Sequence, residues 1–464
     1  MASSNTYLNL DWRSGPKSDV LFESLQRLCN TIDANRQVAI VSSESKAKAV
    51  VVDGNGNKVM SQTRKTCIKA RKSVERHSDN EYLAKLVTIM RFLMRNAALG
   101  KTEMVRAFEY QIKSDRITPE DANKIMKDIA LTIGVHPFLL GVEPESVGQV
   151  YIPEGIKLAM METSSARVYV DKKAKYSTSL NGGKRHQIPR LLVDIAKVNQ
   201  AEASIRAVVV CEHRSIVEKF PKAFEDARFR GVFLVTTGGY PDVATREFLH
   251  ILARHRAFKT VPFLYISDGD PNGIEIYAVL KFGSKACAFA APQMTCPNLK
   301  WAGLSLAQYQ MFVKSWPDRF GPTLPPLSAE KTKEAMVGAQ KDADAAVERV
   351  HTLKIRKPTR QSKRTVATLL GNGCFDDESE ADARAELERL KEGPKVDFFD
   401  LVQPDPHGVV EFIAETVSAE LGEVDSARPR RFYSLSEAQK AAAAAEAAAE
   451  SSESEEEERG SRSP

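Results

Sequence analysis

Acidic side chains stand directly after apolar segments at two places in the middle of the chain. Glu212 follows the apolar run RAVVVC at 206–211, and Asp268 and Asp270 follow PFLYIS at 262–267. Carboxylates held close together repel one another when ionised, and a bound cation removes that penalty. Mg²⁺ is commonly held by one or two carboxylates together with waters and phosphate oxygens. Glu212, Asp268 and Asp270 are therefore candidate ligands of Mg²⁺.

The pattern around these acids predicts a parallel sheet. Continuous apolar runs are typical of strands buried on both faces, and they occur at 206–211, 232–237, 262–267 and 285–290. Helical segments separate them at 215–227, 242–256 and 271–282, and this alternation favours an α/β fold. Because sites form at the carboxyl ends of parallel strands, we expect the three acids to meet at one edge of the sheet.

The motif DGDPNG at 268–273 also has an ordinary structural explanation. It would form a tight turn in which Pro271 opens a helix. It matches the start of a calcium loop as well, but the twelfth position falls on Val279 and Pro271 interrupts the loop, so we reject that site. A phosphatase that uses Asp268 as its nucleophile needs a partner lysine, and none stands at an obvious place.

The joint pattern resembles the Toprim domain, a metal-binding module of topoisomerases and related nucleases. The matching segments are VVVCEHRSIVEKF at 208–220, LVTTGGYPDVATREFLHIL at 234–252 and VPFLYISDGDPNGIEIYAVLKFGS at 261–284, with KWAGL at 300–304. They are most similar to the topoisomerase VI A-subunit family, in particular its meiotic branch of sporulation-specific protein eleven, which breaks DNA to start recombination. The resemblance spans about residues 80–310 and implies a Mg²⁺-dependent DNA-cleaving transesterase.

The resemblance places a tyrosine nucleophile in an upstream winged-helix domain. The family motif has an Arg four residues before the reactive Tyr, and Arg106 and Tyr110 stand at that spacing. Arg106 would bind the scissile phosphate while the Tyr110 oxygen attacks phosphorus and forms a 5′-phosphotyrosyl product. Tyr176 is the rival nucleophile, although it lacks the upstream Arg. A buried structural role for Tyr110 is the other alternative.

Three positions depart from the family pattern. Glu109 stands before Tyr110 in place of an aromatic residue, and an acid there disfavours an approaching phosphate. His213 follows Glu212 at the position where the family usually has Lys, so the positive charge is supplied one position later, by Arg214. Gly238 stands where the family usually has Lys in the turn before Pro241. These changes keep open a non-cleaving DNA-binding or assembly homologue. A topoisomerase VI A subunit that works with an ATPase B subunit is the other alternative to meiotic break formation.

Pattern and composition divide the chain into five segments. We expect a partly disordered N-terminal extension at 1–78, a winged-helix domain with the nucleophilic Tyr at 79–150 and a linker of extended segments at 151–205. The Toprim domain with a C-terminal helical elaboration follows at 206–422, and an Ala/Glu-rich acidic tail, expected to be disordered, at 423–464. Helices are predicted from Asn80, near Thr102, and over 119–133, 328–350, 378–393 and 408–421.

Charge and composition favour a nucleic-acid partner. The 464 residues are 42% hydrophobic and 27% charged, and their net charge is +5. Residues 441–464 hold seven Glu and two Arg, which leaves the first 440 residues at +10. A basic body points to a polyanion. No secretory signal, membrane span or CxxC pair stands out, so we expect an intracellular protein with reduced thiols and no membrane partner.

The resemblance also implies partners and a location. It implies double-stranded DNA as substrate, a topoisomerase VI B-like subunit, and a homodimer in which Tyr110 of one protomer faces the Toprim acids of the other. A meiotic role implies a nuclear, chromosome-associated protein. Basic segments that would contact DNA phosphates or direct nuclear import lie at 64–77, 354–364 and 428–431.

Overall fold

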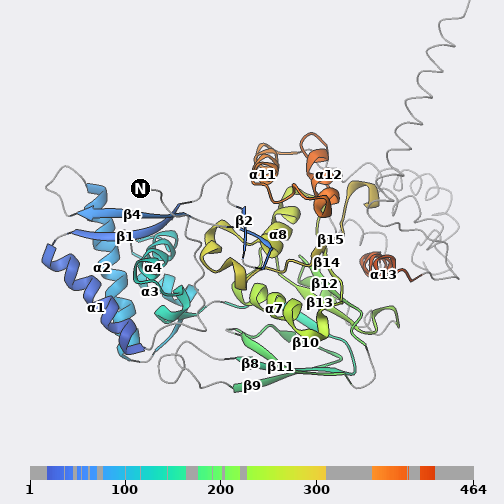
Figure 1. The fold of residues 1–464 in the computed structure, drawn as a ribbon, viewed down its shortest axis with the longest axis horizontal. Helices are drawn as coiled ribbons and strands as arrows, with labels where there is room; N and C mark the ends of the chain where they lie inside the picture. The colour runs from blue at the N-terminus through green and yellow to red at the C-terminus, as the bar shows by residue number, and fades with distance from the viewer. Residues whose placement is uncertain are drawn as a thin grey trace, which may run out of the picture.

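The computed structural model divides into two lobes that lie side by side (Figure 1). It describes residues 18–35, 37–44, 50–53, 55–60, 63–70, 77–99, 101–114, 117–143, 145–162, 176–190, 192–200, 204–219, 227–309, 358–393, 395–396 and 408–423. The predicted helix at 328–350 and all but the first residue of the predicted tail at 423–464 lie outside these ranges. None of the described helices combines the length and apolar character needed to cross a membrane.

The N-terminal lobe combines helices with one antiparallel strand pair. Its elements are α1 (Ser18–Asn35), β1 (Gln37–Glu44), β4 (Thr63–Ala70), α2 (His77–Ala98), α3 (Val105–Ile112) and α4 (Pro119–Ile133). β1 pairs with β4, and α4 packs on α2, α3 and β1. Within the N-terminal extension expected at 1–78, the described elements α1 and β1 help to build the core of this lobe. The three predicted helices are present, and the winged-helix class of the lobe stays a prediction.

Helix α4 shows why its bounds were predictable. Thr118 caps it, with a hydrogen bond from the Asp121 N–H to the Thr118 hydroxyl at 3.2 Å, and the Asp121 carboxylate accepts from the Thr118 N–H. Pro119 occupies the first turn and Gly134, with φ of 74°, ends the helix. These are the local signals that start and stop helices in any context.

The second lobe contains the predicted parallel sheet. Its parallel strands run in the order β13 (Val232–Thr236), β12 (Ala207–Cys211), β14 (Phe263–Ile266) and β15 (Leu299–Trp301). Every residue of β12, β13 and β14 is buried, as the continuous apolar runs indicated. The intervening helices are α6 (Ser215–Lys219), α7 (Val243–Arg254) and α8 (Pro271–Phe282).

One predicted strand is wrong. Residues 285–290 belong to the 3₁₀ segment η6 (Lys285–Gln293), which contains Pro292, and the fourth parallel strand is β15 instead. A short apolar run without alternation does not distinguish a buried strand from a buried helical turn. The prediction therefore placed the strand about one element too early.

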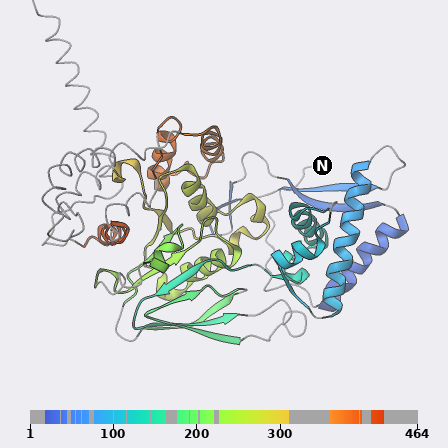
Figure 2. The same cartoon turned by 180° about the vertical axis from the view of Figure 1, so that it is seen from behind.

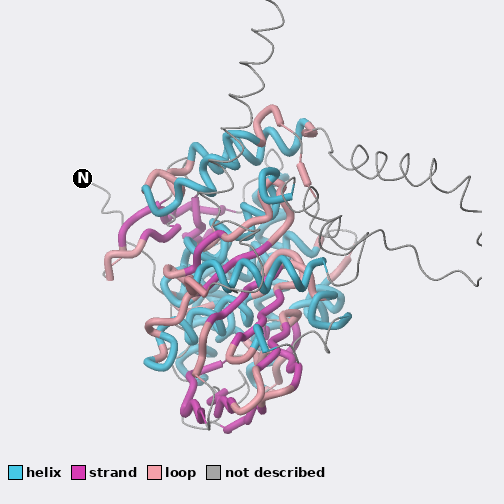
Figure 3. The backbone as a smooth tube through the Cα atoms, turned by 90° about the vertical axis from the view of Figure 1, so that its right-hand side faces the viewer, coloured by secondary structure: helices cyan, strands magenta, loops and turns pink. Residues whose placement is uncertain are grey.

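The segment expected as a linker at 151–205 contains strands of two sheets. β7 (Gln149–Ile152) pairs antiparallel with β13, and β10 (Lys184–Gln187) pairs with β7 at the edge of the main sheet. β11 (Leu192–Gln200), β8 (Ile156–Glu162) and β9 (Tyr176–Asn181) form a separate antiparallel sheet. This second sheet lies at the lower end of the molecule in all three views (Figures 1, 2 and 3). Two short strands, β5 (Glu103–Met104) and β6 (Val142–Glu143), pair in parallel near α3.

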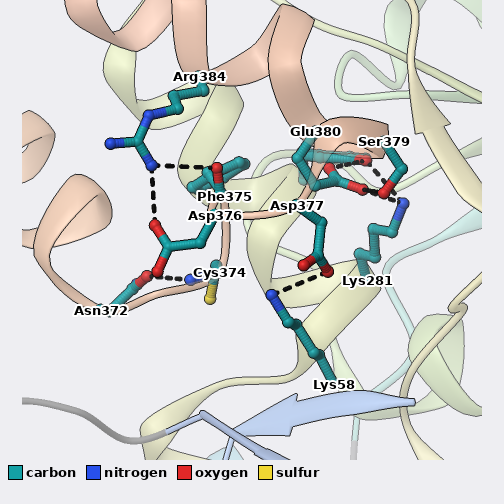
Figure 4. Close-up of polar contacts among 11 residues, drawn as sticks. Lys58, Lys281, Asn372, Cys374, Phe375, Asp376, Asp377, Ser379, Glu380 and Arg384 are labelled. Atoms are coloured by element: carbon teal, nitrogen blue, oxygen red, sulfur yellow. Dashed lines mark hydrogen bonds and ion pairs between the residues drawn. The ribbon is translucent and has the colours of Figure 1, made fainter. Parts of the chain in front are cut away.

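Two further pieces cover the outer side of α8. The hairpin of β2 (Val50–Val52) and β3 (Lys58–Met60) reaches from the N-terminal lobe to α8 and η6. Helices α11 (Arg360–Gly371) and α12 (Ala381–Arg389) also pack against α8, with η7 (Glu378–Glu380) beside them. Figure 4 shows the polar contacts that join them: Lys58 Nζ lies 2.8 Å from Asp377 Oδ2, and Lys281 Nζ lies 2.5 Å from Glu380 Oε1. Helix α13 (Gly408–Glu420), which was predicted at 408–421, packs near η4 (Ala227–Phe229).

Candidate functional site

Glu212, His213 and Asp268 lie together beyond the carboxyl ends of β12 and β14. Register brings them there, because Cys211 at the end of β12 lies opposite Ile266 of β14 in parallel pairing. One ligand-type atom from each of the three side chains lies within 4.8 Å of the others. His213 Nε2 lies 2.9 Å from Asp268 Oδ1. The structure therefore brings two of the three predicted acids to one point of the sheet edge, with an imidazole beside them.

The carboxyl group of Glu212 has a raised pKa. Burial, and next the charge of Asp268, raise the pKa of Glu212 to about 7, while His213 opposes the shift and Asp270 adds to it. Among the described residues, Glu212 Oε2 is buried without a hydrogen-bond partner. A buried carboxylate oxygen next to other acids is costly unless a cation or a donor meets it. The residues present thus fit a divalent cation, which Glu212 and Asp268 would hold.

The loop after β13 fixes the backbone of Glu212. Gly238 and Gly239 donate their N–H groups to the Glu212 carbonyl at 2.9 and 3.0 Å. Gly238 has a φ of 69°, and a Cβ there would lie 3.1 Å from Val147 Cγ1. A lysine at this position, as in the family pattern, would be strained in this conformation. The glycine is therefore suited to a turn that holds Glu212 by backbone contacts.

Asp270 has a different place from the other two acids. It caps α8, because its Oδ1 accepts from the Gly273 N–H at 2.8 Å, and its Oδ2 lies 3.6 Å from Lys395 Nζ. The tight turn followed by Pro271 at the helix start, which was the ordinary explanation of this motif, is present. Asp270 lies near enough to act on the Glu212 charge, but the clustered ligand atoms come from Glu212, His213 and Asp268.

Sequence reasoning missed His213 as a member of the cluster. It treated His213 and Arg214 together as a shifted basic residue. In the structure the two basic side chains point in different directions. Arg214 faces Gln149 on β7, and its Nη2 lies 2.9 Å from the Gln149 amide oxygen when that oxygen is turned toward Arg214. His213 contacts Asp268. Its position directly after Glu212, at the end of a buried strand, marks His213 as a candidate, but it does not give the direction of the side chain.

Tyr110 projects from α3 and is 75% exposed, the highest fraction among the large hydrophobic side chains that the structure describes. Phe108, two residues earlier on the same helix, is fully buried and its ring centroid lies 5.5 Å from that of Phe92. A buried structural role for Tyr110 is therefore wrong. Tyr176, the rival, starts β9, and its side chain lies outside what the structure describes.

Two residues near Tyr110 on α3 have partners. Arg106 stands one turn earlier, as predicted, and its Nε lies 3.2 Å from Glu145 Oε2. Glu109 accepts a hydrogen bond from Asn123 Nδ2 of α4 at 2.5 Å. The Glu109 carboxylate is thus held against α4.

Tyr110 and the acidic cluster belong to different lobes. Helix α3 packs on α4, β5 and β6 in the N-terminal lobe, whereas β12 and β14 lie inside the second lobe. Phe108 belongs to a core cluster of the N-terminal lobe that also includes Ala290 and Met294, whereas Val209 and Ile266 belong to another cluster. The predicted nucleophile and the predicted metal ligands are therefore carried by different lobes of one chain.

A parallel sheet with a Glu after one strand and an Asp after its neighbour is the arrangement of a Toprim domain. The family model for the Toprim domain of the topoisomerase 6 A-subunit and Spo11 proteins matches residues 207–348. Over this region the chain is similar to the Toprim domain of topoisomerase 6 A-subunits and Spo11 proteins, the family that the sequence motifs indicated. The described part of the match comprises β12 to β15 and the helices between them.

Individual relatives point to the same family. The chain is 32% identical to the meiotic recombination protein W68 of Drosophila melanogaster, over 25% of this chain and 34% of the relative. It is 36% identical to the meiotic recombination protein SPO11-2 of Arabidopsis thaliana, over 21% and 25%. It is 28% identical to the A-subunit of the type 2 DNA topoisomerase 6 of Sulfurisphaera tokodaii, over 33% and 35%. The matches thus span between a quarter and about a third of these relatives' own lengths.

Proposed function

We propose that this chain forms DNA double-strand breaks in meiosis by tyrosine transesterification. One observation carries the proposal: Tyr110 is an exposed tyrosine that follows Arg106 by one turn of α3, in a chain whose second lobe is a Toprim domain. The exposed position leaves the Tyr110 hydroxyl accessible to a DNA phosphate, which a nucleophile requires. The names of the relatives W68 and SPO11-2 support the meiotic setting.

The proposed reaction exchanges one ester for another. The Tyr110 oxygen attacks a DNA phosphorus and loses its proton, while the bond from phosphorus to the 3′ oxygen breaks and that oxygen takes up a proton. The product is a 5′-phosphotyrosine and a free 3′ hydroxyl, so no water is consumed and the step is reversible. Arg106 would leave Glu145 and bind the phosphate through its planar guanidinium.

The acids of the second lobe would supply the electrostatic part of the site. Mg²⁺ held there stabilises charge on the phosphate and on the leaving oxygen when it is bound. Glu212 and Asp268 would hold the cation, with Asp270 beside them. Because Tyr110 and these acids lie in different lobes, we propose a homodimer in which each site combines Tyr110 of one protomer with the acids of the other. Such a dimer cuts both strands of duplex DNA.

The same residues would serve a topoisomerase VI A-subunit that passes duplexes with an ATPase B-subunit. The similarity to the Sulfurisphaera tokodaii protein favours this second candidate. Both candidates cut by the same chemistry and share a B-like partner, but only strand passage needs ATP hydrolysis by that partner and resealing. For the meiotic candidate we propose a nuclear, chromosome-associated location.

The test is the recovery of covalent protein–DNA adducts from meiotic cells under denaturing conditions. Wild type and Tyr176→Phe should give adducts, and Tyr110→Phe should give none. Adducts that persist in Tyr110→Phe would overturn the assignment of the nucleophile. If wild type gives none while bound to chromatin, the non-cleaving homologue replaces the proposal. Adducts that disappear on resealing in an ATP-dependent manner favour the topoisomerase.

A further inference from the structure

We propose that His213 is itself a metal ligand, so that this chain holds its cation through a Glu–His–Asp set that prefers Mn²⁺ to Mg²⁺. The proposal rests on the proposed function, because it concerns the metal at the same site, and it goes further by naming a nitrogen ligand and the metal that this ligand selects.

Geometry is the first support. His213 Nε2, one oxygen of Glu212 and one oxygen of Asp268 lie within 4.8 Å of one another, so one ion could contact all three after small side-chain adjustments. Nε2 points at Asp268 Oδ1, at 2.9 Å, and therefore faces into the cluster. In the neutral tautomer with its proton on Nδ1, Nε2 offers a lone pair to a metal.

The position of Asp270 is the second support. Its Oδ1 is engaged by the Gly273 N–H and its Oδ2 lies beside Lys395. Asn272 Nδ2 also lies 3.4 Å from Asp270 Oδ2. Moving this carboxylate toward the cluster would uncap α8, whereas His213 Nε2 already contacts Asp268, another member of the set. His213 is therefore better placed than Asp270 to be the third ligand.

Chemistry decides which ion the set favours. Mg²⁺ prefers oxygen ligands in near-ideal octahedral geometry and keeps several waters. Imidazole nitrogen suits first-row transition metals better than it suits Mg²⁺, and Mn²⁺ is the member of that series that shares the carboxylate and water ligands of Mg²⁺. A lysine at position 213 could not act as a ligand while protonated. The replacement of Lys by His therefore changes this position from a positive charge to a donor atom.

The test uses the full chain stripped of metal and titrated with Mn²⁺, with free Mn²⁺ read by electron paramagnetic resonance. Competition with Mg²⁺ gives the preference between the two ions, and electron spin-echo modulation detects ¹⁴N bound to Mn²⁺. The Glu-rich stretch at 453–458 offers oxygen ligands only, so it contributes no nitrogen signal. His213→Gln keeps a donor toward Asp268, and His186→Ala, on β10, removes an imidazole elsewhere. Glu212→Gln removes a proposed ligand.

We expect ¹⁴N modulation in wild type and in His186→Ala and its loss in His213→Gln. Mn²⁺ affinity should fall at least about tenfold in His213→Gln, since loss of even an outer partner of a ligand costs about 10–100-fold. Mg²⁺ affinity should fall less. Wild-type Mn²⁺ bound without ¹⁴N modulation would overturn the proposal, and if Glu212→Gln still abolished that binding, the metal role in the proposed function would stand. Absence of any bound cation would overturn both.

Discussion

At the scale of single residues, Arg106 already has a partner that DNA would have to displace in the proposed reaction. Its Nε lies 3.2 Å from Glu145 Oε2, and the Arg106 side chain is 73% exposed. An exposed ion pair of this kind contributes about 0–1 kcal/mol. We predict that Glu145→Gln raises DNA affinity by up to about fivefold, because a neutral amide competes less well with phosphate. Binding titrations at one fixed salt concentration measure the effect.

The exposed Glu154→Gln is the matched control for lost negative charge, and it should leave DNA affinity closer to that of wild type. In an Arg106→Ala background Glu145→Gln should have no effect beyond that of the control. A gain that survives in this background would show that Glu145 acts through general repulsion and not through Arg106.

Tyr110 and Phe108 give a matched pair on one helix. Tyr110→Phe should change the free energy of unfolding by less than about 0.5 kcal/mol, since its side chain is exposed. Phe108→Ala should cost about 3–5 kcal/mol, because the buried ring packs against Phe92. Denaturant unfolding of both variants measures the difference. A large loss of stability in Tyr110→Phe would mean that its loss of adducts has a structural cause.

The site could be predicted where it depends on strand ends and helix spacing. Glu212 and Asp268 were predicted to lie together because they follow two parallel strands, β12 and β14, whose carboxyl ends meet at the same edge of the sheet. The direction of His213 could not be predicted, since it depends on the backbone beyond β12 and on which of two neighbouring basic side chains turns toward Gln149. Tyr110 is exposed because Phe108 is the aromatic residue of α3 that packs into the core. In a helix of only eight residues, hydrophobic periodicity does not determine which of the two aromatic side chains is buried.

At the scale of elements, the N-terminus of α4 carries a titratable cap. The hydrogen bond from Lys85, above all, lowers the pKa of Asp121, and the Thr118 backbone adds to the shift. The folded state thus favours the carboxylate, so this stabilisation is present at neutral pH and is lost as pH falls through the lowered pKa. We predict that Asp121→Asn destabilises the chain at pH 7 and that its difference from wild type shrinks below about pH 4. Denaturant unfolding across that pH range measures it.

Glu120→Gln is the control, because Glu120 lies in the same first turn of α4 and its carboxylate also interacts with the helix dipole. The control therefore isolates the effect of the Asp121 contacts with Thr118 and Lys85. Its effect should be smaller than that of Asp121→Asn at neutral pH. An Asp121→Asn difference that stays constant down to the lowest pH would contradict the role assigned to the carboxylate.

Elements with local signals were predicted well, and elements that depend on distant partners were not. Helix α4 has its cap and its terminal glycine within its own sequence, and α8 begins at Pro271 after an Asp cap. The strands β8 and β11, by contrast, lie apart in the sequence, with β9 and β10 between them, and pair only in the fold. Strands β1 and β4 likewise depend on each other and on α4. Because these strands are stabilised by distant partners and not by local signals, their sequences could not be distinguished from those of linkers.

At the scale of the whole molecule, one largely buried ion pair ties η7, beside the C-terminal helices, to helix α8 on the parallel sheet. Glu380 is 2% exposed and contacts Lys281 (Figure 4). It also accepts a hydrogen bond from the Tyr277 hydroxyl at 2.7 Å. We predict that Glu380→Ala costs about 3–5 kcal/mol, because it leaves Lys281 buried without its charge partner. Asp377→Ala, which breaks the more exposed contact with Lys58, should cost less than about 1 kcal/mol. Thermal unfolding of both variants tests this, and equal losses would contradict it.

The separation of nucleophile and acids into two lobes makes a prediction about the assembly. In a dimer of a Tyr110→Phe chain with a Glu212→Gln chain, one composite site combines both defects. The other site combines the intact Tyr110 of the Glu212→Gln chain with the intact acids of the Tyr110→Phe chain. If sites form between protomers, this mixed dimer cuts one strand, whereas each chain alone as a homodimer cuts none.

Differently tagged chains expressed together in meiotic cells make this outcome measurable. Covalent DNA should be recovered on the Glu212→Gln chain alone, because only that chain carries the intact tyrosine. If each site formed within one protomer, every chain in the mixture would lack either nucleophile or metal ligand, and neither tag would carry DNA. The choice of tag therefore reports which lobes meet across the dimer, and a silent mixture beside an active wild type would reject the composite site.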